Sequence, residues 1–285
     1  GPEEILDSDR ELILRRYLEL TRAALEKEPG VELVLWPETV VTLVMKNGAL
    51  LQRQQMIRLA GELGVDLLYG AQIYSGETPY NSIVFLSPQQ GRTQVYHKQR
   101  LVPFVEYFPL EGQLNRWLDL DFKIGRYRAG DEYSLFSHRR GPLAGAICFE
   151  SYFGDYTRRF ARRGGRHLFI ATNDVWFGES IGLEQHAQVA ALRAAEMGIG
   201  VTQVANSGIS ISFDYRGREL MRTGKGERGF HILKLDLARR NTLYRLAGDF
   251  FPPLSLLLVA AAVLALRKSR SPSPPPGGSP HRKSR

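Results

Sequence analysis

Short apolar runs of strand length alternate with amphipathic helices through most of this chain, and this alternation constrains the fold more than any other feature. A typical pair is a helical pattern over about Ala49–Leu63 followed by a strand-like run over Asp66–Ile73. Later strand-like runs follow one another closely, and strands are expected near Gly200–Val204, Ile209–Tyr215 and Gly229–Leu235. This order predicts an α/β domain in which layers of helix lie outside a sheet core.

The apolar run from Leu143 ends at Cys148, the only cysteine among 285 residues. A buried strand that delivers a thiol at its carboxyl end, with an acid at Glu150, can present a nucleophile. A lone cysteine is more often a small buried hydrophobic residue. The balance shifts because Glu38 and Lys98 also stand at the ends of apolar runs. We therefore interpret Cys148 as a candidate nucleophile.

Charge is concentrated at the carboxyl end of the chain. The net charge is +8, and six basic residues lie in the last nineteen positions, which carry no acid; without them residues 1–266 have a net charge of +2. A nucleic-acid-binding function is therefore not expected. The six histidines are scattered, with no pair at metal-ligand spacing, so no metal site is expected either.

An uncharged apolar segment of seventeen residues runs from Phe250 to Leu266. This length is at the short limit for a membrane span, and a buried core helix is the alternative. The Ser-, Pro-, Gly- and Arg-rich tail that follows is unsuited to covering a core helix, so we favour the span. The positive-inside rule then predicts a cytoplasmic tail and a globular domain on the other side of the membrane.

Three motifs together resemble the Glu-Lys-Cys triad of the nitrilase, or carbon–nitrogen hydrolase, superfamily. They are Leu-Trp-Pro-Glu ending at Glu38, Tyr-His-Lys-Gln-Arg-Leu-Val-Pro-Phe around Lys98, and Ala-Ile-Cys-Phe-Glu around Cys148. Each motif alone is a weak signal, but all three occur in this order and each follows an apolar run. The resemblance implies the α/β class and an α-β-β-α sandwich of the nitrilase type, followed by one transmembrane helix.

More narrowly, the chain resembles the apolipoprotein N-acyltransferase family, bacterial membrane enzymes that complete lipoprotein maturation. The motifs that favour this family over soluble amidases are Arg100–Pro109, Asn173–Gly178, Gln185-His186, Arg193–Glu196 and the terminal apolar helix. In that family a multi-helix membrane bundle precedes the nitrilase domain, and the resemblance implies that this chain lacks the bundle. Phe149 also replaces the family's usual Tyr, and Val105 its usual Gly.

The resemblance implies three segments and a division of chemical roles. The segments are a catalytic domain at residues 1–245, a transmembrane helix at 250–266 and a basic disordered tail at 267–285. A thiol is only partly ionised at neutral pH, so Glu38 is expected to take the proton of Cys148. Lys98 and the backbone N–H of Phe149 are expected to stabilise the oxyanion that forms when the thiolate attacks an ester.

Two more acids and four aromatic residues belong to the expected site. Glu106 is expected to orient Lys98 and keep it charged, and Glu150 is a site residue of undefined role. The aromatic residues, expected either to contact acyl chains or membrane or to pack in the core, are Phe104, Phe108, Trp176 and Phe177.

The resemblance implies transfer of a fatty acyl chain from a phospholipid, through a Cys148 thioester, to the N-terminal amine of a diacylglyceryl-cysteine apolipoprotein. The expected partners are the phospholipid donor, the diacylglyceryl-modified apolipoprotein acceptor and the membrane, with no cofactor. The expected location is the bacterial inner membrane, with the catalytic domain on the periplasmic side.

Two other functions stay open. The first is hydrolysis of a small amide or nitrile by the same triad, for which the apolar span would have no use. The second is an inactive binding domain, against which the intact set of Glu38, Lys98 and Cys148 argues.

Overall fold

The computed structural model describes residues 7–43, 49–76, 78–109, 116 and 127–269. By its internal contacts the chain divides into two compact units, Gly1–Leu246 and Ala247–Arg285. The first unit contains the helices α1 (Asp7–Lys27), α2 (Ala49–Leu63), α4 (Gly154–Arg162) and α5 (Gly182–Met197). The short helix α6 (Leu243–Ala247) ends at the boundary, and α7 (Phe251–Ser269) belongs to the second unit.

The first sheet has five strands, in the order β1-β3-β4-β5, with β2 also paired to β3. They are β1 (Leu33–Leu35), β2 (Val41–Leu43), β3 (Asp66–Ser75), β4 (Thr78–Ser87) and β5 (Arg92–His97). β1 and β2 run parallel to β3, whereas β3, β4 and β5 form an antiparallel meander. This register places His97 opposite Ser82 and so brings the residues after β5 next to the middle of β4.

The second sheet has six strands, in the order β11-β10-β9-β8-β7-β6. They are β6 (Leu135–His138), β7 (Gly141–Ile147), β8 (His167–Thr172), β9 (Gly200–Ala205), β10 (Ile211–Phe213) and β11 (Glu219–Arg222). The central strands β7, β8 and β9 are parallel, and α4 and α5 are the crossovers between them. Parallel strands present their carboxyl ends at one edge of a sheet, where ligands of α/β proteins commonly bind.

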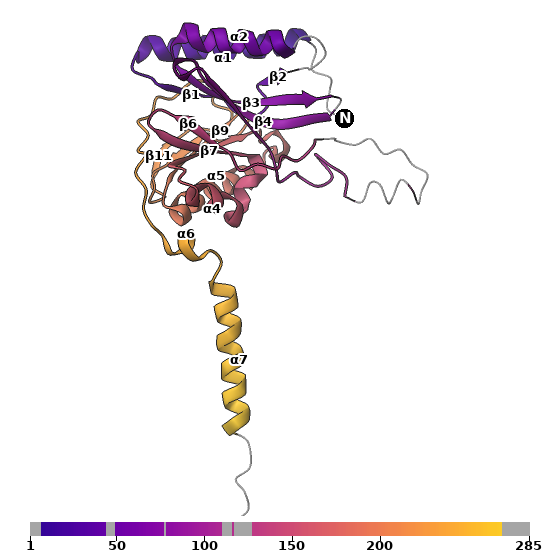
Figure 1. Cartoon of the computed structure of the whole chain (residues 1–285), viewed down its shortest axis with the longest axis vertical. Helices are drawn as coiled ribbons and strands as arrows, with labels where there is room; N and C mark the ends of the chain where they lie inside the picture. The colour runs from indigo at the N-terminus through magenta and orange to yellow at the C-terminus, as the bar shows by residue number, and fades with distance from the viewer. Residues whose placement is uncertain (1–6, 44–48, 77, 110–115, 117–126, 270–285) are drawn as a thin grey trace, which may run out of the picture. The chain divides into compact units, whose positions relative to one another are not determined.

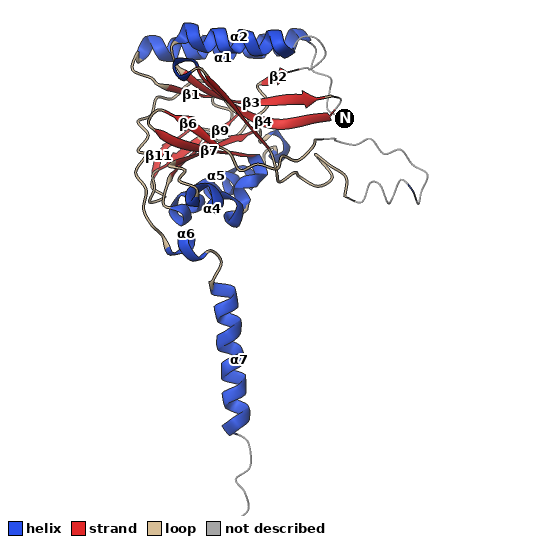
Figure 2. Cartoon of the chain, in the orientation of Figure 1, coloured by secondary structure: helices blue, strands red, loops and turns tan. Residues whose placement is uncertain are grey.

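The first unit is built of four layers, helix, sheet, sheet and helix (Figures 1 and 2). α1 and α2 cover one face of the first sheet, where Met56 and Ala60 are buried against Leu67 and Tyr69 of β3. α4 and α5 cover the outer face of the second sheet. This arrangement confirms the α-β-β-α sandwich that the sequence predicted.

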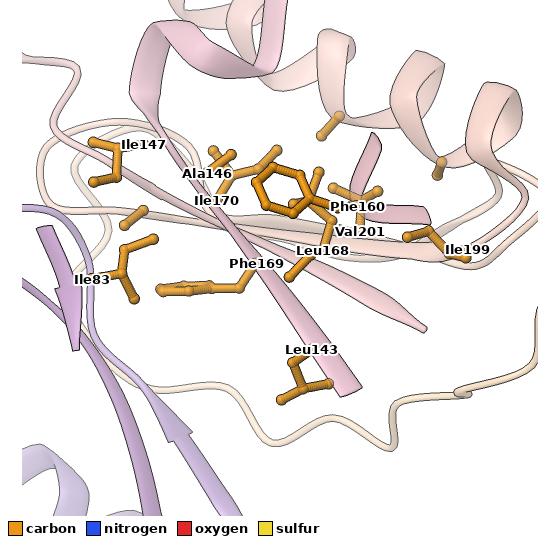
Figure 3. Packing of buried hydrophobic residues seen from close by; sticks show 14 of the residues in the cluster. Ile83, Leu143, Ala146, Ile147, Phe160, Leu168, Phe169, Ile170, Ile199 and Val201 are labelled. Atoms are coloured by element: carbon orange, nitrogen blue, oxygen red, sulfur yellow. The ribbon is translucent and has the colours of Figure 1, made fainter. Parts of the chain in front are cut away.

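The largest buried cluster lies on both faces of the second sheet (Figure 3). Between the sheets, Ile83 of β4 belongs to the same cluster as Phe169 of β8. On the helix side, Phe160 of α4 and Ala190 of α5 are fully buried. Because the parallel strands are buried on both faces, their sequences are mostly apolar, as those of parallel strands covered by helices usually are.

One predicted strand is wrong. Residues 229–235 contain no strand, although four of the seven are Phe, Ile or Leu. The edge of the second sheet is formed instead by β11, which pairs antiparallel with β10 and which the sequence pattern did not indicate. A strand-like sequence shows that a segment could pair with a sheet. It does not show whether a strand with a free edge lies next to that segment in the fold.

α7 is the one helix among the described residues that is long and apolar enough to cross a membrane. Its apolar window covers residues 251–268, and none of that window is buried. This length and exposure match the predicted transmembrane segment at 250–266. Arg267 and Lys268 extend the helix beyond the apolar segment, and most of the predicted basic tail, residues 270–285, lies outside the described residues.

Candidate active site

Glu38 is held at the end of β1 by a close approach of two backbones. The Gly70 N–H donates to the Pro37 carbonyl at 3.0 Å, which continues the pairing of this segment with β3. A Cβ atom at Gly70 would lie only 2.4 Å from the Pro37 carbonyl oxygen and 2.5 Å from the Cα of Glu38. Glycine is therefore required here, and Thr39 next to Glu38 has a positive φ of 56°.

Lys98 is placed directly after β5. Its N–H donates to the Asn81 carbonyl of β4 at 2.8 Å, so the β4–β5 register continues through this residue. The Lys98 ammonium group donates to Glu106 Oε1 at 2.9 Å, and both side chains are buried. The other oxygen of Glu106 accepts from the Val102 N–H at 2.8 Å, which closes the loop that carries Glu106.

Cys148 stands where β7 changes into a 3₁₀ turn over Cys148–Tyr152. Its φ of +50° is rare for a residue with a side chain, and such strain commonly marks functional positions. The strand-to-turn change presents the thiol at the carboxyl edge of the parallel strands. The sequence prediction that a buried strand delivers this thiol is confirmed.

Glu150 fastens this turn to the segment after β5. The carboxylate is completely buried, and it accepts from the N–H groups of Ile147 at 2.8 Å, Gln99 at 2.7 Å and Arg100 at 3.1 Å. It also accepts from the Tyr96 hydroxyl at 2.7 Å. Glu150 therefore positions Cys148 relative to Lys98, which gives a structural role to a residue whose role the sequence left undefined.

Asn81 joins the two other carboxylates and was missed by the sequence analysis. Its side-chain amide donates to Glu38 Oε1 at 2.7 Å and to Glu106 Oε1 at 3.1 Å. The second oxygen of Glu38 accepts from the backbone N–H of Asn173, at the end of β8, at 2.8 Å. Glu38 therefore links the two sheets. Asn81 lies in the middle of β4 and belongs to no local motif that would have identified it.

The charges of this cluster act on one another. Burial raises the pKa of Glu38, against the attraction of Lys98. Burial alone would lower the pKa of Lys98, but the carboxylates of Glu38 and Glu106 outweigh burial and hold it above its usual value. Burial and the charge of Glu38 raise the pKa of the Cys148 thiol to about 12, while Lys98 opposes them. A thiol in this setting needs a base to ionise it at neutral pH.

The four aromatic candidates and Phe149 differ in their surroundings. Phe104 is 65% exposed and Trp176 is 75% exposed, whereas Phe177 packs against the core cluster. Phe108 contacts Phe104 edge to face, with ring centroids 5.4 Å apart. Phe149 follows Cys148, and its ring lies 5.2 Å from that of Tyr152. Phe104 and Trp176 are therefore free to touch a ligand or a lipid surface, and Phe177 has a packing role.

A second polar pair lies beside Cys148 and was also missed. His186 of α5 and Asp174, just after β8, are buried, and His186 Nδ1 lies 2.8 Å from Asp174 Oδ1. Cys148, Asp174 and His186 could each offer a metal one atom, and these atoms all lie within 4.8 Å of one another. Asp174 and His186 each stand in a motif noted in the sequence, Asn173–Gly178 and Gln185-His186. These motifs are distant from Cys148 along the chain, and only the fold brings them to it.

The sequence matches the family model for carbon–nitrogen hydrolases over residues 4–245. It is 30% identical over 300 residues to an apolipoprotein N-acyltransferase of Chlorobaculum tepidum, which covers 94% of this chain and 54% of that protein. It is 32% identical over 278 residues to an apolipoprotein N-acyltransferase of Azotobacter vinelandii, which covers 95% of this chain and 51% of that protein. The chain therefore spans about half the length of the curated relatives it matches.

Two solved structures are similar to the fold. One is a carbon–nitrogen hydrolase from Helicobacter pylori G27, with a TM-score of 0.63, 15% identity and coverage of 77% of this chain and 82% of that chain. The other is Saccharomyces cerevisiae Nit3, a member of branch 10 of the nitrilase superfamily, with a TM-score of 0.59, 17% identity and the same coverage. The fold is thus of the nitrilase type.

Proposed function

Because this chain belongs to the carbon–nitrogen hydrolase family, we propose that it is an acyltransferase with a cysteine nucleophile. It moves a fatty acyl chain from a phospholipid, through a thioester on Cys148, to the N-terminal amine of a diacylglyceryl-cysteine apolipoprotein. Sequence relatives along nearly the whole chain are apolipoprotein N-acyltransferases, which supports this choice within the family.

The observation that carries the proposal is the electrostatic coupling of buried Glu38 and buried Lys98 to the half-buried thiol of Cys148. The charges of Glu38 and Lys98 both act on the Cys148 thiol, although the three residues come from different strands. A base, a cation and a thiol whose charges act on one another are what acyl transfer through a thioester needs. No further cofactor enters the proposed steps.

In the first half-reaction Glu38 takes the proton of Cys148, and the sulfur attacks the ester carbonyl carbon of the phospholipid. The carbonyl oxygen becomes an oxyanion, which Lys98 and the backbone N–H of Phe149 stabilise. The bond to the lysophospholipid oxygen then breaks, and that oxygen takes the proton back from Glu38. The product on the enzyme is the Cys148 thioester. The raised pKa of Glu38 suits a group that must both accept and return a proton.

In the second half-reaction the α-amine of the apolipoprotein attacks the thioester. Glu38 accepts a proton from the amine, the carbon–sulfur bond breaks, and the acyl chain ends on nitrogen as an amide. Cys148 leaves as a thiolate and recovers its proton from Glu38. Glu106 keeps Lys98 charged and in place through both steps by the 2.9 Å ion pair between them.

Both proposed substrates carry acyl chains that insert into a bilayer, so the reaction is expected at a membrane. The exposed apolar helix α7 is suited to anchor the domain there. The exposed rings of Phe104 and Trp176 are suited to contact acyl chains or the bilayer interface. We place the protein in the bacterial inner membrane, with the catalytic domain at residues 1–245 on the periplasmic side.

The test is to incubate the full chain in detergent micelles with a phospholipid and to map the product by mass spectrometry. One acyl chain should appear on Cys148, and hydroxylamine should remove it, as it removes thioesters. Cys148→Ser should form no adduct, because a serine hydroxyl is ionised far less than a thiol. Glu38→Gln keeps the size of the side chain and should slow adduct formation strongly. An adduct on another residue, or none, contradicts the proposal.

Hydrolysis of a small amide is the second candidate, since the solved structures with this fold include an amidase. The two are separated by adding a diacylglyceryl-cysteine peptide to the acylated protein. Acyl transfer predicts that the peptide amine gains the chain while Cys148 loses it. Release at the same rate without the peptide, as free fatty acid, would favour the hydrolase.

A further inference from the structure

The pair formed by Asp174 and His186 lies against Cys148, yet no step of the proposed reaction uses it. Both side chains are buried, and His186 Nε2 lies 3.3 Å from the carbonyl oxygen of Cys148. Atoms of the thiol, the imidazole and the carboxylate all lie within 4.8 Å of one another. At this distance the protonation state of the imidazole acts directly on the thiol.

A proton on each nitrogen of the His186 ring satisfies all the hydrogen bonds around it. Nδ1 faces Asp174 Oδ1, an acceptor that also receives the Thr172 hydroxyl at 2.7 Å. Nε2 faces the Cys148 carbonyl oxygen and, at 3.2 Å, the Ser151 hydroxyl oxygen. Ser151 has a single hydroxyl proton, and its shorter contact, at 2.9 Å, is with the same Cys148 carbonyl, so the proton is assigned to that bond. A lone pair on Nε2 would therefore meet two oxygen lone pairs, whereas an N–H there bonds to them.

The surroundings of the ring also favour a cation. The ring of Tyr152 stacks on the imidazole, with centroids 5.4 Å apart and planes 15° apart, and Phe177 approaches at 5.7 Å. Aromatic faces attract a positive charge. Asp174 Oδ2 is buried and has no hydrogen-bond partner among the described residues, so a neighbouring cation is needed to offset the charge of this carboxylate.

We propose that Asp174 holds His186 as an imidazolium, and that this cation is a positioning residue which stabilises the Cys148 thiolate and fixes the backbone of the turn. The inference rests on the proposed function only in taking Cys148 as the nucleophile. The other titratable groups that face this trio are Tyr152 from the turn and, on the far side of Cys148, Glu38 and Lys98. Lys98 would stabilise the oxyanion. His186, which lies on α5 beside the second sheet, would instead stabilise the thiolate.

The first experiment measures the protons on the ring. The full chain, labelled with ¹⁵N-histidine and held in detergent micelles, is studied by long-range ¹H–¹⁵N NMR at pH 7.5, where a free imidazole is mostly neutral. Both nitrogens of His186 should be protonated. Asp174→Asn keeps the size of the side chain and removes its charge, and His186 should then carry one proton. A singly protonated ring in the unchanged protein overturns the proposal.

The second experiment measures thiolate formation without any acyl substrate, by the rate of Cys148 alkylation with iodoacetamide across pH. His186→Gln removes the cation and should slow alkylation at pH 7.5 by about tenfold or more, which corresponds to one pH unit in the thiol titration. His167→Gln is the matched control. His167 is a buried histidine of the same sheet, opposite Leu143 at the far end of β7, and its loss should leave the rate unchanged.

The outcomes separate this inference from the proposed function. Equal pH profiles for the unchanged protein and His186→Gln overturn the thiolate role, even when the ring is doubly protonated. Circular dichroism checks that each variant is folded. If His186→Gln does not fold, the NMR signal is assigned by substituting the other histidines, and the ring protonation decides. Neither experiment uses a phospholipid, so a failure of acyl transfer leaves both results interpretable.

Discussion

Asn81 and Lys98 allow two carboxylates to stay close together in a buried place. Glu38 and Glu106 share the Asn81 amide as donor, and Lys98 supplies the positive charge between them. Like charges that share a buried site raise one another's pKa, and Glu106 is indeed one cause of the raised pKa of Glu38. The proton affinity of the proposed base is therefore set partly by a residue that takes no proton itself.

We predict that Glu106→Gln moves the acid limb of Cys148 acylation to lower pH. The rate falls when Glu38 is protonated, so the limb follows the pKa of Glu38, which burial raises above 4.5. Removing the Glu106 charge removes one cause that raises this pKa. The measurement is the single-turnover rate of Cys148 acylation by an activated ester between pH 4 and 8. Glu11→Gln, in an exposed position, is the control, and a limb that stays in place contradicts the prediction.

His167 is predicted to make the protein acid-sensitive. Burial lowers the pKa of His167 to about 4, while the unfolded chain binds this proton near 6.5. The unfolded state thus binds more protons between these values, so stability is lost as pH falls from about 6.5 to about 4, by on the order of 3 kcal/mol. Urea unfolding at pH 7 and pH 4.5 should show this loss, and His167→Gln should reduce it. An unchanged pH dependence in the variant would count against the prediction.

At the scale of elements, the site depends on how closely strand ends approach one another. Glu38 reaches its place because β3 carries Gly70 where the segment after β1 passes. Cys148 reaches its place because it follows β7 with a positive φ and because Glu150 binds the turn to the segment after β5. The positions of the candidate catalytic residues Glu38 and Cys148 are thus set by backbone contacts between neighbouring elements.

Gly70→Ala is predicted to impair acylation while the fold is retained. The added Cβ atom would overlap the Pro37 carbonyl and the Glu38 Cα, so the backbone that carries Glu38 must shift. A displacement of about 1 Å can cost on the order of 10²-fold in rate. The measurement is the rate of Cys148 acylation, with circular dichroism to check the fold. Gly61→Ala in α2, where the nearest atom is 4.0 Å away, should leave the rate unchanged, and equal loss in both variants would contradict the argument.

At the scale of the whole molecule, a nitrilase-type sandwich and an apolar helix occur in one chain. The sandwich alone has the same fold as the two solved structures of the nitrilase type. The helix α7 adds an exposed apolar segment, and exposing so much apolar surface to water is unfavourable. The combination supports chemistry on lipid substrates, and it makes the topology of the chain a decisive observation.

We predict that Cys148 faces the periplasm and the carboxyl terminus faces the cytoplasm. Arg267 and Lys268 follow the apolar segment directly, and basic residues favour the cytoplasmic side. A membrane-impermeant protease added to intact spheroplasts should digest the globular domain and spare a tag placed at the carboxyl terminus. Protection of the domain, with loss of the tag, would reverse the orientation and exclude a periplasmic acceptor.

Local sequence patterns were enough to predict the class of fold and the three triad candidates. α2 has the bounds that the pattern predicted, because local periodicity specifies a helix when one of its faces is buried. Glu38, Lys98 and Cys148 were identified because each stands in a short motif at a strand end. These are local signals, and the chain carries them wherever it folds.

Tertiary structure alone decided the rest. Asn81 became a site residue through the β4–β5 register, and Asp174 and His186 met Cys148 because α5 crosses back over β8. β11 pairs with β10 and occupies the edge of the second sheet, so the segment 229–235 does not form the predicted strand there. Contacts of this kind join residues distant in sequence, and their energy depends on register and crossover geometry, which no local pattern contains.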